Sequence, residues 1–156
     1  MRAHFSQRGA TIGELLVVLA IIGLMASVAL PQFYKIRERQ VITTAGSDIV
    51  SVLERAKSRT LASVSSSEYG VHFQSDRVII FKGTSYSSEA LTNETINILS
   101  PATISNVTLS GVSATTGDVY FNRLSGAPNK TGTVTISTSS YTKTITISAT
   151  GGASSN

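Results

Sequence analysis

The sequence predicts an α+β protein in which one long N-terminal helix packs on antiparallel β-sheets. Residues 9–33 form an apolar run with a single charge, Glu14. Apolar residues then recur every three or four positions to about residue 63, which is typical of an amphipathic helix. From residue 68 the apolar pattern has a period of two, as in half-buried strands. The 156 residues therefore hold one apolar segment and one modest domain.

Composition excludes several classes of chemistry. The chain has no cysteine, so disulfides, thiolate metal sites and cysteine nucleophiles are ruled out. The net charge of +4 comes mostly from the two flanks of the apolar run, because the eight basic residues after Gln40 face seven acidic ones. A nearly neutral domain is weak support for nucleic-acid binding.

The apolar run is long enough to cross a membrane. Sixteen uncharged residues, Leu15–Leu30, give about 24 Å of helix, and residues 10–14 extend it toward the ~30 Å of a hydrocarbon core. The run exceeds the apolar core of an ordinary secretory signal. Basic residues flank it on both sides, so charge alone leaves its orientation open. We assign residues 10–33 to a transmembrane half of the helix.

Glu14 is the one carboxylate in this segment. A charge within a bilayer is costly unless it is paired or neutralised. Two interpretations are open: Glu14 lies in the head-group region, or it awaits a cationic partner from another subunit.

A short basic leader ending in Gly9 is followed by ATIGELLVV. This segment resembles the class III leader of type IV pilins and type II secretion pseudopilins. The resemblance implies that a prepilin peptidase cuts after Gly9 and methylates the new N-terminus, Ala10. Glu14 is then the fifth residue of the mature chain, where the family's glutamate recruits the subunit by pairing with a neighbour's N-terminal amine. The chain departs from the family at Ala10, usually Phe, and at Gly13, usually Ile or Val.

We expect one helix from about Ile12 to about Ser63, with residues 34–67 forming its amphipathic soluble half. Pro31 lies where the family's first helix often bends, and a proline within a helix removes a hydrogen bond. The face predicted to pack on a sheet consists of Ile42, Ala45, Ile49, Leu53, Ala56 and Val64. Thr60 occupies the position on this face between Ala56 and Val64.

The rest of the chain predicts a β-rich domain over residues 68–150. Residues 69–73 and 77–82 form a hairpin joined by Gln-Ser-Asp. Residues 83–93 and 123–132 are polar or turn-rich and predict loops, and residues 151–156 predict a flexible tail. Further strands are expected at 96–99, 104–109, 119–122, 133–137 and 141–148, where Thr and Val dominate.

This second half resembles the GspH/FimT domain of minor pseudopilins and minor pilins. The resemblance is carried by ERAKS on the helix, by the paired YGVHF and VIIFKG segments, and by VYFNRLSG, GTVTI and TITIS toward the C-terminus. It implies two small β-sheets beside the helix. Glu14 argues against the K-type tip pseudopilin, which typically lacks this residue.

The sequence offers no enzyme site, cofactor or metal centre. His4 lies in the leader, and His72 stands alone on a strand, whereas metal sites need several convergent donors. No nucleophile elbow occurs. Lys130-Thr131 lacks the glycines of a phosphate loop.

Two functions follow from the resemblance. The first is a structural subunit of a type II secretion pseudopilus or a type IV pilus, supporting protein secretion. Its partners would be the prepilin peptidase, other subunits, the assembly platform of the bacterial inner membrane and, before assembly, the bilayer. The N-terminus would be cytoplasmic and the C-terminal domain outside. The second is a FimT-like minor pilin that binds DNA, for which Arg123, Lys130 and Lys143 are the candidate contacts.

Overall fold

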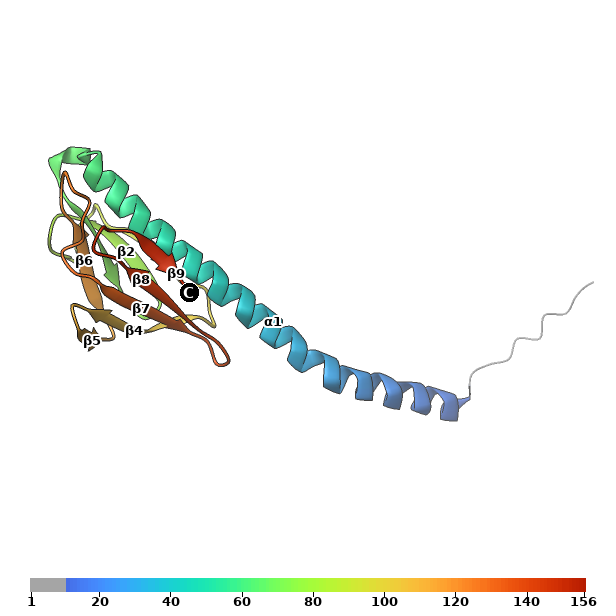
Figure 1. Cartoon of the computed structure of the whole chain (residues 1–156). Helices are drawn as coiled ribbons and strands as arrows, with labels where there is room; N and C mark the ends of the chain where they lie inside the picture. Colours follow the sequence, from blue (N-terminus) through green and yellow to red (C-terminus); the bar gives the residue numbers. More distant parts are fainter. Residues whose placement is uncertain (1–10) are drawn as a thin grey trace, which may run out of the picture. The chain divides into compact units, whose positions relative to one another are not determined.

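The computed structural model describes residues 11–156, except for the side chains of residues 28–31 (Figure 1). The chain divides into two compact units, Met1–Ile36 and Arg37–Asn156. One helix, α1 (Ile12–Leu61), contributes to both. It ends within two residues of the predicted end. Gly9 and Ala10 lie outside the described residues.

In the first unit, the part of α1 that begins at Ile12 carries almost continuous apolar side chains. The helix is long and apolar enough to cross a membrane, and its most apolar stretch is not buried within the chain. The helix assignment passes through Pro31, and the predicted bend at this residue stays a prediction.

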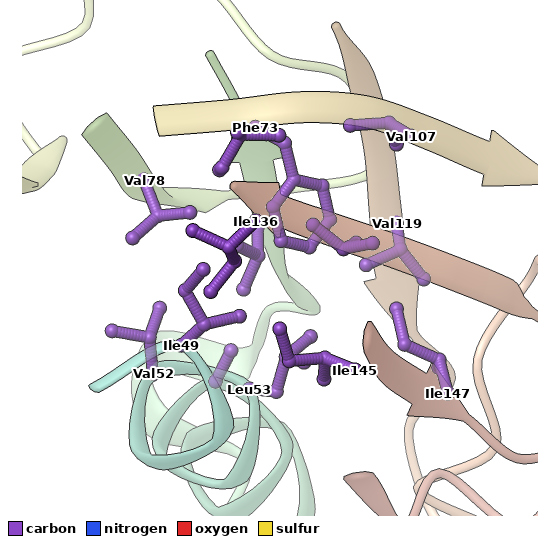
Figure 2. Close-up of a cluster of buried hydrophobic side chains, with 14 of the residues drawn as sticks. Ile49, Val52, Leu53, Phe73, Val78, Val107, Val119, Ile136, Ile145 and Ile147 are labelled. Atoms are coloured by element: carbon purple, nitrogen blue, oxygen red, sulfur yellow. The ribbon is translucent and has the colours of Figure 1, made fainter. Parts of the chain in front are cut away.

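In the second unit, one face of α1 is buried. Ile49, Leu53 and Ala56 are fully buried, and Figure 2 shows Ile49, Val52 and Leu53 pointing toward the side chains of the strands. Thr60 joins the helix to the first strand, because its hydroxyl donates to the Ala56 carbonyl at 3.0 Å and accepts from the Tyr69 amide at 2.9 Å. The predicted packing face is therefore confirmed from Ile42 to Thr60.

The prediction was wrong for Val64, the last residue of the predicted face. It lies in the 3₁₀ turn η1 (Val64–Ser66), outside α1, and is exposed. The residue before this turn, Ser63, adopts a left-handed conformation with φ of 50°. A left-handed residue cannot continue a right-handed helix, so the 3.6-residue pattern ends before Val64.

The strands form two antiparallel sheets. The first has the order β3-β2-β1-β6, and β1 and β2 form the predicted hairpin. The second has the order β5-β4-β7-β8-β9. The strands of the first sheet are β1 (Tyr69–Phe73), β2 (Arg77–Lys82), β3 (Glu94–Asn97) and β6 (Gly117–Phe121). Those of the second are β4 (Thr103–Leu109), β5 (Val112–Ala114), β7 (Gly132–Ser137), β8 (Thr142–Ile147) and β9 (Ala153–Ser155).

One hydrophobic core joins the second unit's helix to both sheets. Alternate residues of most strands point into it, as the period of two predicts, and β5 contributes none. Figure 2 shows Phe73 and Val119 of the first sheet gathered with Ile136 and Ile145 of the second. The predicted α+β, pilin-like arrangement of one long helix packed on antiparallel sheets is thus confirmed.

Two strands depart from the sequence-based expectation. Ala153–Ser155 form β9, which pairs with β8, so the flexible tail predicted over residues 151–156 is wrong. The Thr144 and Asn156 amides each donate to the other residue's carbonyl, at 3.2 and 2.9 Å. The second addition, β5, has three exposed residues and is held to β4 by backbone pairing and by a hydrogen bond of 2.9 Å between the hydroxyls of Thr108 and Ser113. Each strand has only three residues, too few for the apolar alternation by which strands are found in a sequence.

Candidate assembly site

The first candidate site is the uncovered apolar surface of α1 in the first unit. Ile12 is 81% exposed, Leu24 71% and Met25 67%. A helix that is apolar on all sides needs a nonaqueous environment, since such a surface in water is strongly unfavourable. Lipid, or the helices of other subunits, can supply that environment.

Glu14 caps the beginning of this helix. Its Oε2 accepts hydrogen bonds from the Thr11 amide at 2.9 Å and the Thr11 hydroxyl at 3.2 Å, while the Thr11 Oγ1 accepts from the Glu14 amide at 3.2 Å. This reciprocal pair is a capping box, which satisfies amides left free at a helix N-terminus. Thr11 was not predicted as a functional residue, although the sequence signal for such a cap, Thr-x-x-Glu before an apolar run, is present.

Two curated proteins from Pseudomonas aeruginosa, each called a fimbrial protein, are similar to this chain. Each is 38% identical over 56 residues, which is 36% of this chain and 36% of the relative. The likeness supports a pilin-like family. The match covers little more than a third of the length of these fimbrial proteins. No family model and no solved structure matches the chain.

The residues just after the apolar segment are tied to the second sheet. The Glu38 carboxylate accepts hydrogen bonds from the hydroxyls of Thr138 and Ser139 in the turn between β7 and β8. Hydrogen bonds lower the pKa of Glu38 below its ordinary value. The bond from Ser139 has the largest effect, and Ser140 adds a further one. The turn thus fixes α1 at the start of the second unit.

The three candidate nucleic-acid contacts lie in one loop and on one strand. Arg123, in the loop after β6, donates from Nη1 to the Ser66 carbonyl at 2.9 Å. Lys130 is exposed in the same loop, nearer β7. Lys143, on β8, lies with its aliphatic stem close against Gly46 of α1. Nucleic-acid contact by these residues stays a prediction.

His72 belongs to a small polar cluster on the outer face of the first sheet. Its Nδ1 contacts the Asp118 carboxylate, and its Nε2 lies 3.2 Å from the Gln74 amide nitrogen. The Tyr86 ring stacks on the imidazole with centroids 3.9 Å apart. In residues 11–156 no three His, Cys, Asp or Glu side chains are grouped to hold a metal ion. The Tyr86 contact is tertiary, and residues 83–93 carry no local signal for it.

Proposed function

We propose that this chain is a minor pilin or pseudopilin of the GspH/FimT type, a structural subunit that enters a filament through the apolar part of α1. The observation that carries the proposal is this uncovered apolar surface, which follows a basic leader and begins at the Thr11–Glu14 cap. The likeness to fimbrial proteins supports a structural rather than a catalytic chain.

On this proposal the apolar surface has two successive environments. In the inner membrane, lipid covers residues 10–33; in the filament, the helices of neighbouring subunits do so. Residues 1–9 are the leader, and the domain beyond residue 33 lies outside the membrane. Supporting secretion or DNA uptake would then be a property of the assembled machine.

Processing can be tested by mass. The mature chain should lack Met1–Gly9 and carry one methyl group on Ala10 when it is purified from cells that contain a prepilin peptidase. Cells without the peptidase should yield the full-length chain. Retention of residues 1–9 in peptidase-positive cells would contradict the proposed cleavage.

The assembly role of Glu14 can be separated from its capping role. Glutamine can replace glutamate in a capping box but carries no charge, so Glu14→Gln keeps the cap and removes the charge. If Glu14 pairs with a neighbour's amine, both Glu14→Gln and Glu14→Ala should abolish incorporation into filaments, measured in sheared filament fractions.

The matched control is Thr11→Ala, which removes the hydroxyl of the cap and leaves the charge of Glu14. This variant should still be incorporated. If Glu14→Gln is incorporated normally while Thr11→Ala and Glu14→Ala fail, Glu14 acts only as a cap and the pairing role is wrong.

A further inference from the structure

The second sheet has one face in the core and one face toward solvent. Alternate side chains of its strands enter the core, among them Val134, Ile136 and Ile145. The residues between them point the opposite way, because side chains alternate along a strand. We call the outward surface of this sheet the hydroxyl face, and none of its residues is buried. It consists of Thr103, Asn106, Thr108, Ser113, Thr133, Thr135, Ser137, Thr142, Thr144, Thr146 and Ser154.

The strand register aligns these residues in rows that run across the sheet. Thr108 of β4 lies beside Thr133 of β7, which lies beside Thr146 of β8. Ser113 on β5 and Ser154 on β9 extend this row to both edges of the sheet. Two shorter rows cross β4, β7 and β8, one of Asn106, Thr135 and Thr144 and the other of Thr103, Ser137 and Thr142. Hydrogen-bonding side chains therefore repeat in two directions.

The rows form a grid with regular dimensions. Neighbouring strands of a sheet lie about 4.8 Å apart, and alternate residues of one strand lie about 6.7 Å apart. Seven residues of the grid are threonines, whose branched Cβ restricts χ1 and so holds the hydroxyl and the methyl group in place. Near β5 the Asn106 side chain donates to the Thr108 hydroxyl at 3.1 Å, and the Thr108 and Ser113 hydroxyls lie 2.9 Å apart. The grid is thus ordered before any partner binds.

The hydroxyls at the centre of the grid are available to solvent. Four threonines there make no side-chain hydrogen bond to a protein group described in the structure, namely Thr133, Thr135, Thr144 and Thr146. Polar groups that lack a protein partner bind water. The strand geometry therefore sets the positions of the waters that cover this face.

The hydroxyl face carries no charge and no aromatic ring. None of the chain's 13 Lys and Arg or 9 Asp and Glu residues belongs to it. The outer face of the first sheet, by contrast, carries the contact of His72 with Asp118 and the stacked ring of Tyr86. The preference of threonine for strands applies to both sheets, so it does not account for this difference.

This composition restricts the kind of partner. Nucleic acids and acidic lipids are bound by clustered Lys and Arg, and the centres of protein interfaces are apolar and aromatic. Small-molecule sites are concave and lined mostly by hydrophobic and aromatic side chains. A polysaccharide would exchange hydrogen bonds to water for equivalent bonds to sugar hydroxyls, and such an exchange gains little. An uncharged partner that keeps the bound waters in place avoids this exchange.

We infer that the hydroxyl face binds ice. The two spacings of the grid are close to repeat distances of hexagonal ice, so waters held by the threonine hydroxyls can join the crystal while they keep these bonds. Water-mediated bonds are nearly as favourable as direct ones. Neighbouring strands twist relative to one another, so the match is best over the central strands β4, β7 and β8. Ice binding goes beyond the proposed function and does not depend on it, because the face belongs to the second unit alone.

Growing ice excludes ordinary solutes, so uptake into ice reports binding directly. The full-length chain in detergent micelles should enter slowly grown ice several-fold more than the double variant Thr135→Tyr/Thr144→Tyr. These threonines are paired neighbours at the centre of the grid, and the added rings would break its spacing. Tyrosine favours strands, so the fold should persist, which circular dichroism checks. The matched control is Thr95→Tyr at an exposed position of β3 in the first sheet, which should leave uptake unchanged.

A single variant covers the case in which the double variant does not fold. Thr146→Tyr changes an exposed position in the longest row and should also lower uptake several-fold. Equal uptake of the unchanged chain and these variants would overturn the inference, as would an equal loss in Thr95→Tyr. Retention on insoluble cellulose or chitin without uptake into ice, abolished in Thr146→Tyr, would make the partner a polysaccharide and overturn ice binding. Incorporation into filaments is measured separately, so each of these failures leaves the proposed function standing.

Discussion

At the scale of single residues, Gly151 determines how closely two loops of the second unit approach. It is buried, with a φ of +75°, and a Cβ at this position would lie 2.2 Å from the Gly126 carbonyl oxygen. The Lys57 ammonium donates to the neighbouring Thr150 carbonyl at 3.1 Å. The end of α1, the loop after β6 and the turn before β9 therefore meet at a point where a side chain cannot fit.

We expect Gly151→Ala to lower the free energy of unfolding by roughly 2–4 kcal/mol, because it adds a backbone clash to the strain of a left-handed alanine. Gly111→Ala is the control, since Gly111 has a φ of +82° and open space around it; it should cost about 1 kcal/mol. Denaturant unfolding followed by circular dichroism measures both. Equal losses would mean that the close approach to Gly126 does not contribute.

A second residue-scale prediction concerns Glu38. Its hydroxyl partners lower its pKa in the folded chain, so the folded state binds fewer protons than the unfolded state. Glu38 therefore contributes stability above its ordinary pKa of 4.5, and this contribution is lost as the pH falls through the lowered value. Asp76, whose pKa Arg77 lowers, acts in the same direction.

Glu38→Gln should reduce the loss of thermal stability on acidification, and Ser139→Ala should raise the pKa of Glu38 toward its ordinary value. Unfolding temperatures across the acidic range, with carboxyl titration by NMR, measure the two effects. Asp76→Asn serves as the comparison, because it should change the acid response without shifting the titration of Glu38. An unshifted Glu38 in Ser139→Ala would contradict the assigned cause.

At the scale of elements, α1 has different surroundings in the two units, and matched isoleucines test this. Ile49 is fully buried, whereas Ile36 is 62% exposed. Ile49→Ala should lower the unfolding free energy by about 2–5 kcal/mol, and Ile36→Ala by less than about 0.5 kcal/mol. Similar losses, measured by denaturant unfolding of the full chain in detergent, would mean that the core does not depend on the packing face of α1.

Elements that bury alternate or 3.6-spaced apolar residues were predictable from the sequence. The hairpin of β1 and β2, the strands β4, β6, β7 and β8, and the packing face of α1 all have such patterns. β9 consists of Ala-Ser-Ser, and only its pairing with β8 specifies it. A pattern in one segment cannot report hydrogen bonds that a distant segment supplies, which is why β5, β9 and the Tyr86 stack were missed.

Hydrogen exchange tests β9 directly. Amides along a strand point alternately to its two neighbours, and the Thr144 amide donates to Asn156. Deleting residues 153–156 should therefore accelerate exchange at Thr144 and Thr146 by at least tenfold, while Lys143 and Ile145, which face β7, keep most of their protection. Uniform exchange at all four amides in the intact chain would contradict the pairing.

At the scale of the whole molecule, the candidate assembly site was predictable in part. The apolar run and Glu14 are local features, so the sequence alone identified both. The Glu38 contacts with Thr138 and Ser139 join residues about 100 positions apart, and nothing in either segment signals them.

The proposed topology places the whole second unit outside the cytoplasm, and cysteine labelling can test it. Val112 is 69% exposed and Val134 is fully buried, and the natural chain offers no competing thiol. In spheroplasts, a membrane-impermeant maleimide should label Val112→Cys without lysis, because β5 would face the outside. Val134→Cys should react only after denaturation, which controls for access through the fold. Labelling of Val112→Cys only after lysis would place the domain in the cytoplasm, where it could not join an extracellular filament.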